Sequence, residues 1–386
     1  MAESGESPRL SDELGPVDYL MHRGEANPRT RSGIMALELL DGTPDWDRFR
    51  TRFENASRRV LRLRQKVVVP TLPTAAPRWV VDPDFNLDFH VRRVRVSGPA
   101  TLREVLDLAE VILQSPLDIS RPLWTATLVE GMADGRAAML LHVSAAEPSP
   151  LLRRRSLTTR TEAIDIRLAD LHKAAKAGGG SINDAYLAGL CGALRRYHEA
   201  LGVPISTLPM AVPVNLRAEG DAAGGNQFTG VNLAAPVGTI DPVARMKKIR
   251  AQMTQRRDEP AMNIIGSIAP VLSVLPTAVL EGITGSVIGS DVQASNVPVY
   301  PGDTYLAGAK ILRQYGIGPL PGVAMMVVLI SRGGWCTVTV RYDRASVRND
   351  ELFAQCLQAG FDEILALAAS FDTQGAGSVP RSVSGS

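Results

Sequence analysis

His142 is the residue of this sequence best placed to take a proton during catalysis. It lies near the end of an apolar run, residues 137–143, which follows the dipeptide Asp134-Gly135. Such a dipeptide between two apolar runs predicts a β-hairpin. In the second strand His142 shares one face with Leu140. An imidazole there can act as a general base on a hydroxyl group, or it can be a hydrogen-bonded structural histidine, and both interpretations stay open.

The other reactive side chains follow no spacing that indicates a second kind of chemistry. There is no Gly-x-Ser-x-Gly elbow, no HExxH or CxxC pattern and no glycine-rich phosphate loop. The remaining histidines stand on predicted helix exteriors or outside any motif. They are His22, His90, His172 and His198. The sequence therefore predicts no metal site and no bound cofactor.

Three polar residues stand where predicted elements begin or turn. Asn183 and Asp184 open a long helix, and Ser181 with an acid three residues later resembles a capping box. Asn296 is predicted to lie in a turn before a proline, where an asparagine amide has a common structural use. For each of these residues a structural role and a substrate-binding role are both open.

The elements that must position these residues alternate between strands and helices. Helices are predicted at residues 45–63, 101–114, 167–176, 181–201, 241–250 and 349–371. Strands are predicted at residues 33–40, 79–81, 87–94, 123–130, 137–143, 163–166, 210–217, 228–235, 323–331 and 335–342. This alternation predicts a mixed α/β protein, and 386 residues suffice for two domains with cores of their own.

Composition excludes several classes of partner and location. The net charge is only +2, which gives no reason to expect nucleic-acid binding. Three scattered cysteines, Cys191, Cys336 and Cys356, favour a reducing cytosol over a disulfide framework. The polar N-terminus does not resemble a secretory signal. Residues 262–290 are almost free of charge, but their prolines and glycines favour short buried or interfacial helices over a membrane span.

Several short motifs appear in one order along the chain and together resemble a known family. Pro122-Leu123-Trp124 ahead of Gly131 resembles the PLW…G element of the bacterial wax ester synthase/diacylglycerol acyltransferase family. The Asn-Asp pair that opens a helix and an Asn-Val-Pro element have counterparts here at Asn183-Asp184 and at residues 296–298. The segments 213–217, 225–226 and 241–250 also look like that family's C-terminal half.

The resemblance implies a two-domain fold like that of CoA-dependent acyltransferases such as chloramphenicol acetyltransferase, with mixed sheets and a central tunnel. The domains would be residues 1–150 and 151–372, followed by a disordered tail at 373–386. It implies transfer of a long-chain acyl group from acyl-CoA, a co-substrate rather than a cofactor, to diacylglycerol or a fatty alcohol. The expected location is the cytoplasm, with peripheral association at a membrane or lipid droplet.

The chain departs from the family where the catalytic motif should stand. In the family the strand corresponding to residues 137–143 ends in HHxxxDG, whose second histidine is the general base. Here Ser144 takes the place of the first histidine, and neither a second histidine nor Asp-Gly follows. We therefore expect several tens of residues to be absent and catalysis to be impaired. The alternative is a non-catalytic lipid- or acyl-CoA-binding relative, or a deletion product. A condensation-domain type is disfavoured by the PLW, Asn-Asp and Asn-Val-Pro set.

Overall fold

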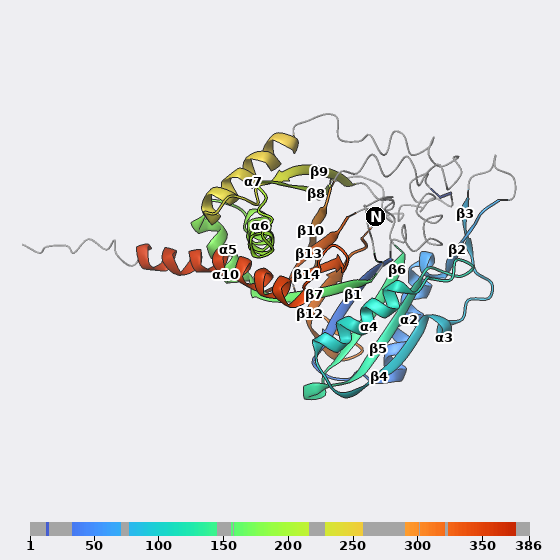
Figure 1. The fold of residues 1–386 in the computed structure, drawn as a ribbon. Coiled ribbons are helices and arrows are strands. Elements are labelled where there is room, and N and C mark those ends of the chain that lie inside the picture. Colours follow the sequence, from blue (N-terminus) through green and yellow to red (C-terminus); the bar gives the residue numbers. More distant parts are fainter. Residues whose placement is uncertain are drawn as a thin grey trace, which may run out of the picture.

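The computed structural model describes residues 13–14, 33–70, 77–144, 156, 158–215, 228–257, 290–300, 302–320 and 323–375. Two six-stranded mixed sheets form its framework (Figure 1). The first has the order β11-β12-β1-β6-β5-β4. Its strands are β1 (Gly33–Leu40), β4 (Val91–Ala100), β5 (Trp124–Met132), β6 (Ala137–Ser144), β11 (Tyr305–Leu306) and β12 (Ala309–Ile317).

The second sheet has the order β7-β14-β13-β10-β8-β9. Its strands are β7 (Thr159–Arg167), β8 (Leu208–Asn215), β9 (Phe228–Ala235), β10 (Val292–Pro298), β13 (Met325–Arg332) and β14 (Trp335–Asp343). In this sheet β10 runs parallel to both β8 and β13, whereas the other pairs are antiparallel. A two-stranded ribbon of β2 (Gln65–Val68) and β3 (Arg78–Val81) lies at the outer edge of the first half (Figure 1).

Helices cover the two sheets in different ways. Four helices pack against the second sheet around one apolar core: α5 (Leu168–Ala177), α6 (Ile182–Ala200), α7 (Pro242–Arg257) and α10 (Asp350–Gly375). On the first sheet, α4 (Leu102–Gln114) and α2 (Trp46–Arg59) cover opposite faces. Alternate residues of β1, β5 and β6 therefore enter two separate cores, as two-residue periodicity requires. Two short helices, η1 (Leu61–Arg64) and α3 (Leu87–His90), and a turn at η2 (Ala133–Gly135) complete the first half.

The sequence predicted most of these elements, and one strand prediction was wrong at its start. Residues 87–94 were expected to form a single strand, but the first four form α3 and β4 begins only at Val91. Asn86 caps this helical turn, since its side chain accepts a hydrogen bond from the backbone N–H of Asp88. The apolar segment 262–290 and the tail 373–386 fall largely outside the described residues.

Part of the C-terminal half of the chain belongs to the first sheet. Strands β11 and β12 follow the second-sheet strand β10 in sequence, yet β12 pairs antiparallel with β1 in the first sheet. Side chains of the second sheet hold β12 as well, because the Thr337 hydroxyl donates to the Gln314 carbonyl at 2.5 Å. The boundary at residue 150 stays a prediction, but the C-terminal half contributes two strands to the N-terminal sheet. The tunnel expected between the sheets also stays a prediction.

Candidate active site

His142 lies in the middle of the first sheet, two residues before β6 ends. The strand registers place it beside Met35 of β1 and Thr125 of β5. Only 2% of its surface is exposed. Its ring lies against the backbone of Gly33, where an added Cβ would come within 2.5 Å of Nε2. Gly33 therefore leaves the room that the imidazole occupies, and His142 is a buried core residue in this structure.

The side of the sheet that carries His142 is apolar. By strand parity His142 points to the same face as Leu140 and Ala138, which belong to the core beneath α4. A general base must come within about 3 Å of the proton that it removes. A buried imidazole on this face can contact an acceptor hydroxyl only if the backbone packed against it moves away. The segment 145–155, where the family motif was expected, lies outside the described residues.

Asp184 takes part in capping the N-terminus of α6. Its Oδ2 accepts hydrogen bonds from the backbone N–H and the hydroxyl of Ser181, each at 2.8 Å. The Asp184 N–H in turn lies 3.3 Å from the Ser181 hydroxyl oxygen. This is the reciprocal capping box that the sequence predicted, and it occupies the buried carboxylate with the helix terminus. The structure thus gives Asp184 a structural role, while Asn183 is half-buried in the same first turn.

One residue of α6 joins the Asn-Asp element to the Asn-Val-Pro element. The hydroxyl of Tyr186 donates a long hydrogen bond, 3.4 Å, to the carbonyl oxygen of Ser295 on β10. Burial raises the pKa of Tyr186 well above its ordinary value, so the phenol remains a donor. Asn183 lies one helical turn before Tyr186, and Asn296 directly follows Ser295. The Asn-Asp element at the start of α6 and the Asn-Val-Pro element on β10 are therefore neighbours.

The placement predicted for Asn296 was wrong. A turn was expected, but Asn296 lies within β10, where it pairs with Leu329 of β13. Its side chain is exposed rather than buried. Val292 and Ala294, on the same side of the strand, belong to the core under α6. Asn296 is thus the next position on that face, at the point where the strand leaves the core and a ligand could reach its amide.

Sequence reasoning missed a column of stacked rings around Trp124, the tryptophan of the PLW element. The His90 ring stacks between Trp124, at a centroid distance of 4.7 Å, and Phe85, at 5.1 Å. Phe53 of α2 stacks on the far side of Trp124 at 6.0 Å. The Trp124 indole N–H donates to the Leu63 carbonyl at 2.8 Å. Trp124 therefore fastens α2 and η1 to the first sheet, which explains why this position requires a large ring with a donor.

His90, like His142, is buried in the first half. Its Nδ1 donates to the carbonyl oxygen of Trp124 at 2.7 Å, and its Nε2 has no hydrogen-bond partner among the described residues. Burial lowers its pKa, an effect that the Trp124 carbonyl opposes and that Arg121 and Arg92 reinforce. The neutral ring is consequently the stable form. The spacing of aromatic residues on either side of residue 90 was the signal that could have indicated this stack.

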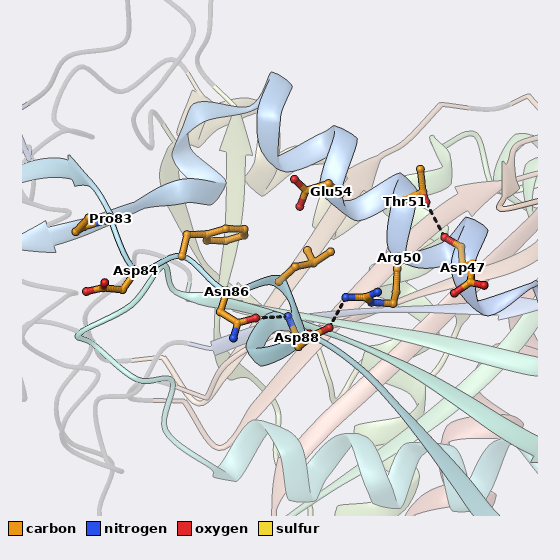
Figure 2. A pocket seen from close by; sticks show the side chains of 10 residues that line it. Asp47, Arg50, Thr51, Glu54, Pro83, Asp84, Asn86 and Asp88 are labelled. Atoms are coloured by element: carbon orange, nitrogen blue, oxygen red, sulfur yellow. Dashed lines mark hydrogen bonds and ion pairs between the residues drawn. The ribbon is translucent and has the colours of Figure 1, made fainter.

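A surface pocket of about 680 Å³ lies between α2 and the segment before β4, and Phe85 of the ring stack is one of the residues that line it (Figure 2). Arg50 points to Asp88 and forms an ion pair with it. Asn86 bonds to the backbone of α3 at 2.9 Å. Glu54, at the upper wall, pairs with Arg58 and Arg64. The Arg50–Asp88 ion pair in the pocket thus joins α2 to α3, and the polar side chains of the pocket indicate no catalytic chemistry.

Within the described part of the chain, no group of three histidine, cysteine or acidic residues is arranged to hold a metal ion. One described helix, at Asp350–Ala369 of α10, is long and apolar enough to cross a membrane, and 39% of that stretch is buried inside the protein. This helix packs closely on α6: a Cβ on Gly360 would lie 2.6 Å from the Gly189 carbonyl oxygen. Such packing is what a core helix of a globular domain makes.

Two mixed sheets of this form also occur in solved structures of other proteins. The structure is similar to a wax ester synthase/diacylglycerol acyltransferase from Marinobacter aquaeolei VT8, with a TM-score of 0.71 and 18% identity over 92% of this chain and 100% of that one. It is also similar to the first condensation domain of the CDA synthetase, with a TM-score of 0.63 and 14% identity over 95% and 97% of the two chains. At such identities the likeness establishes the fold, which confirms the predicted α/β class.

Sequence comparison gives the family. Residues 5–146 match the wax ester synthase/diacylglycerol acyltransferase catalytic domain, and residues 224–365 match the C-terminal domain of the same family. A candidate diacylglycerol O-acyltransferase of Mycobacterium tuberculosis is 79% identical over 491 residues, spanning all of both chains. A second one from that organism is 24% identical over 466 residues, covering 92% of this chain and 97% of its own. The chain belongs to the wax ester synthase/diacylglycerol acyltransferase family.

The alignment with the similar mycobacterial relative also contains a length difference. Its 491 positions exceed the 386 residues of this chain by about 105. Both chains are covered in full, so the relative contains residues that have no counterpart here. The match to the catalytic domain ends at residue 146, directly after the strand that should lead into HHxxxDG. The relative is therefore longer than this chain, and the position of the absent residues stays a prediction.

Proposed function

We propose that this chain binds a long-chain acyl-CoA and an acceptor alcohol, diacylglycerol or a fatty alcohol, and transfers the acyl group slowly because the general base of its family is missing. The observation that carries the proposal is the sequence after β6, which contains no second histidine and no Asp-Gly. The alignment supports it, since about 105 positions of the relative are unfilled by this chain of 386 residues. Family membership supports the substrate class.

The reaction needs a base at one step. The acceptor oxygen attacks the thioester carbonyl, a carbon–oxygen bond forms, the carbon–sulfur bond breaks, and the hydroxyl proton ends on the CoA thiol. A positioned base contributes about 10²–10⁴-fold to such a transfer. The family's base position corresponds to Ala145, three residues after His142. Side chains that are an odd number of residues apart on a strand point to opposite faces. His142 is therefore an inefficient substitute.

A second candidate function is binding without transfer. Two observations favour it: His142 is buried against Gly33, and the Asp184 carboxylate is engaged in a capping box. A protein of this kind would hold acyl-CoA or lipid in the groove that its family uses for catalysis. In either case we propose a cytoplasmic protein with peripheral association at a membrane or lipid droplet. No partner other than these lipids, and no nucleic acid, is proposed.

Restoring the missing segment tests the proposal. A segment that contains the family's HHxxxDG motif is inserted after Val143, and transfer from palmitoyl-CoA to diacylglycerol is measured. We expect a gain of about 10²–10⁴-fold over the chain as it stands. The matched control carries the same insert with the second motif histidine replaced by alanine. Equal rates for the original chain and the restored chain would disprove the impairment.

Calorimetry separates the two candidate functions from a chain with no role in lipid chemistry. Palmitoyl-CoA is titrated into the folded protein, with free CoA as the control. Saturable heat for palmitoyl-CoA together with a low transfer rate supports either candidate, and the restored chain then distinguishes them. Folded protein that gives no saturable heat with either compound would exclude an acyl-CoA role.

A further inference from the structure

An arginine at the junction of the two sheets has a buried donor without a partner. Arg332 ends β13, and its side chain is only 9% exposed. Its Nη1 donates to the side-chain oxygen Oε1 of Gln314 on β12 at 2.9 Å. Its Nη2 is buried and has no hydrogen-bond partner among the described residues. Nearly all buried donors in folded proteins are paired, so an exception of this kind is a candidate position for a ligand.

A carboxylate without a partner lies close to this arginine. Glu38 of β1 pairs in register with Gln314 of β12, so their side chains are neighbours on one face of the sheet. Glu38 is half-buried, and among the described residues its carboxylate forms no hydrogen bond or ion pair. Burial raises the pKa of Glu38, an effect that the charge of Arg332 opposes. One free donor and one free acceptor therefore lie next to Gln314.

An apolar strip leads along the first sheet to Glu38. The strip is formed by cross-strand neighbours of β1 and β6: Ile34, Ala36, Leu141 and Val143. Ile34 is 37% exposed, and the other three side chains are half-buried. Leu40, the next residue after Glu38 on the same face of β1, is fully buried in the core that includes Phe49 of α2. The open part of this face therefore ends at Glu38.

The second sheet adjoins the apolar strip. Gly316 of β12 pairs with Ala36, and a Cβ on Gly316 would lie 2.8 Å from Cγ1 of Val328 on β13. Val297 of β10, which is 38% exposed, lies on the same face of the second sheet as Val328. Arg332 shares that face too, by strand parity. The sheets thus meet here through small or aliphatic side chains, and Glu38 with Arg332 introduces charge at one end.

The spacing along β1 indicates the length of a chain that could lie on this strip. Strand β6 ends at Ser144, which pairs with Gly33, and the catalytic motif of the family is expected directly after it. Glu38 lies five residues further along β1 than Gly33. With one more residue to the motif, the distance is roughly 20 Å at about 3.4 Å per residue. An extended hydrocarbon chain advances about 1.3 Å per bond, so about sixteen carbons span this distance.

We infer that Glu38 and Arg332 bind a hydroxyl group that a long-chain substrate carries about sixteen carbons from its reacting end. A hydroxyl group is both donor and acceptor, so its oxygen can accept from Nη2 of Arg332 while its proton is donated to the Glu38 carboxylate. A terminal methyl group would leave both charged groups unpaired, which is unfavourable. The hydroxyl can belong to the acyl chain of the acyl-CoA or to an acceptor diol. This inference rests on the proposed function, which supplies the reacting end.

Binding measurements on the full chain test this inference. Calorimetry compares ω-hydroxypalmitoyl-CoA with palmitoyl-CoA, and hexadecane-α,ω-diol with hexadecanol in the same detergent, so that the two sources of the hydroxyl are distinguished. We expect the hydroxylated member of at least one pair to bind about tenfold more tightly, as hydrogen bonds to charged groups allow. Glu38→Gln and Arg332→Met should each remove most of this preference and change the binding of palmitoyl-CoA little.

Glu351→Gln is the matched control, because it makes the same chemical change at the exposed start of α10. This variant should keep the full preference, and circular dichroism should show that all variants fold. Glu38→Gln is nearly isosteric, so it keeps the test decisive even if Arg332→Met does not fold.

Three results would overturn the inference. If palmitoyl-CoA binds but neither hydroxylated ligand is preferred, the inference fails and the proposed function stands. A preference that survives in either folded variant, Glu38→Gln or Arg332→Met, also overturns the inference. If none of the four ligands gives saturable heat with folded protein, the inference and the proposed function fail together.

Discussion

The guanidinium of Arg341 on β14 and the carboxylate of Glu110 on α4 form a buried ion pair, with Nη2 and Oε2 3.0 Å apart. The hydroxyls of Thr159 and Thr161 on β7 donate to the same carboxylate. One side chain of the first half is thus held by two strands of the second. Together with the strand β12, this cluster fixes how the two sheets meet.

Glu110→Ala is therefore expected to destabilise the protein by about 3–5 kcal/mol, because Arg341 would remain as a buried charge without its partner. Urea unfolding followed by circular dichroism measures the free energy of unfolding. Asp107→Ala is the matched control, since Asp107 pairs with Arg103 on the exposed side of the same helix. That change should cost less than about 1 kcal/mol. Equal losses for the two variants would contradict this account of the interface.

The contact between α6 and α10 gives a second prediction about stability. A Cβ on Gly360 would lie 2.5 Å from the Ala193 nitrogen, and these are backbone atoms that cannot move aside. Gly360→Ala should consequently destabilise the protein by about 1–3 kcal/mol through overpacking. Gly42→Ala is the control, because nothing lies within 4 Å of its added Cβ. Thermal unfolding of the two variants distinguishes them, and a fully stable Gly360→Ala variant would show that the helices pack less tightly.

Local signals predicted the parts of this fold that are determined locally. Residues 228–235 form a strand with the predicted bounds, and Ser181 with Asp184 forms the predicted capping box. What sequence reasoning missed depends on partners far along the chain. The addition of β12 to the first sheet depends on pairing with β1, more than 250 residues earlier. The helical turn at residues 87–90 places His90 between two rings, which overrides the strand pattern.

The candidate site divides in the same way. The capping role of Asp184 follows from two residues three positions apart and could be predicted. The burial of His142 follows from the strand beside it, where Gly33 leaves room for the ring. The exposure of Asn296 depends on where β10 leaves its core. Neither the position of Gly33 beside His142 nor the end of the core along β10 can be read from a local sequence pattern. A lone acid, Glu110, on the apolar face that includes Leu106 and Leu113 was the available signal for the interface.

His90 predicts how stability depends on pH. Its pKa is lowered in the folded protein, so between that value and the ordinary histidine pKa of about 6.5 the unfolded chain binds more protons. Stability therefore falls as pH decreases below about 6.5 and is regained as pH rises. His90→Phe keeps a stacked ring and should flatten this dependence between neutral and mildly acidic pH. An unchanged slope in His90→Phe would rule out this assignment.

The last prediction concerns the residual rate of acyl transfer in the chain as it stands. If His142 is a buried core residue, removing its imidazole changes that rate little, whereas loss of a working general base would cost about 10²–10⁴-fold. His142→Gln is the better variant, because it keeps a polar side chain of similar size beside Gly33, and His142→Ala serves as a second test. Both are assayed with palmitoyl-CoA and diacylglycerol, with folding checked by circular dichroism.

The same substitution in the restored chain completes the test. There His142→Gln should again leave the rate almost unchanged, while alanine at the second motif histidine should remove most of the gain. The contrary result is easy to recognise. If His142→Gln and His142→Ala both abolish transfer by folded protein of the original length, His142 is the base, and the strand end must open to bring its ring to the acceptor hydroxyl.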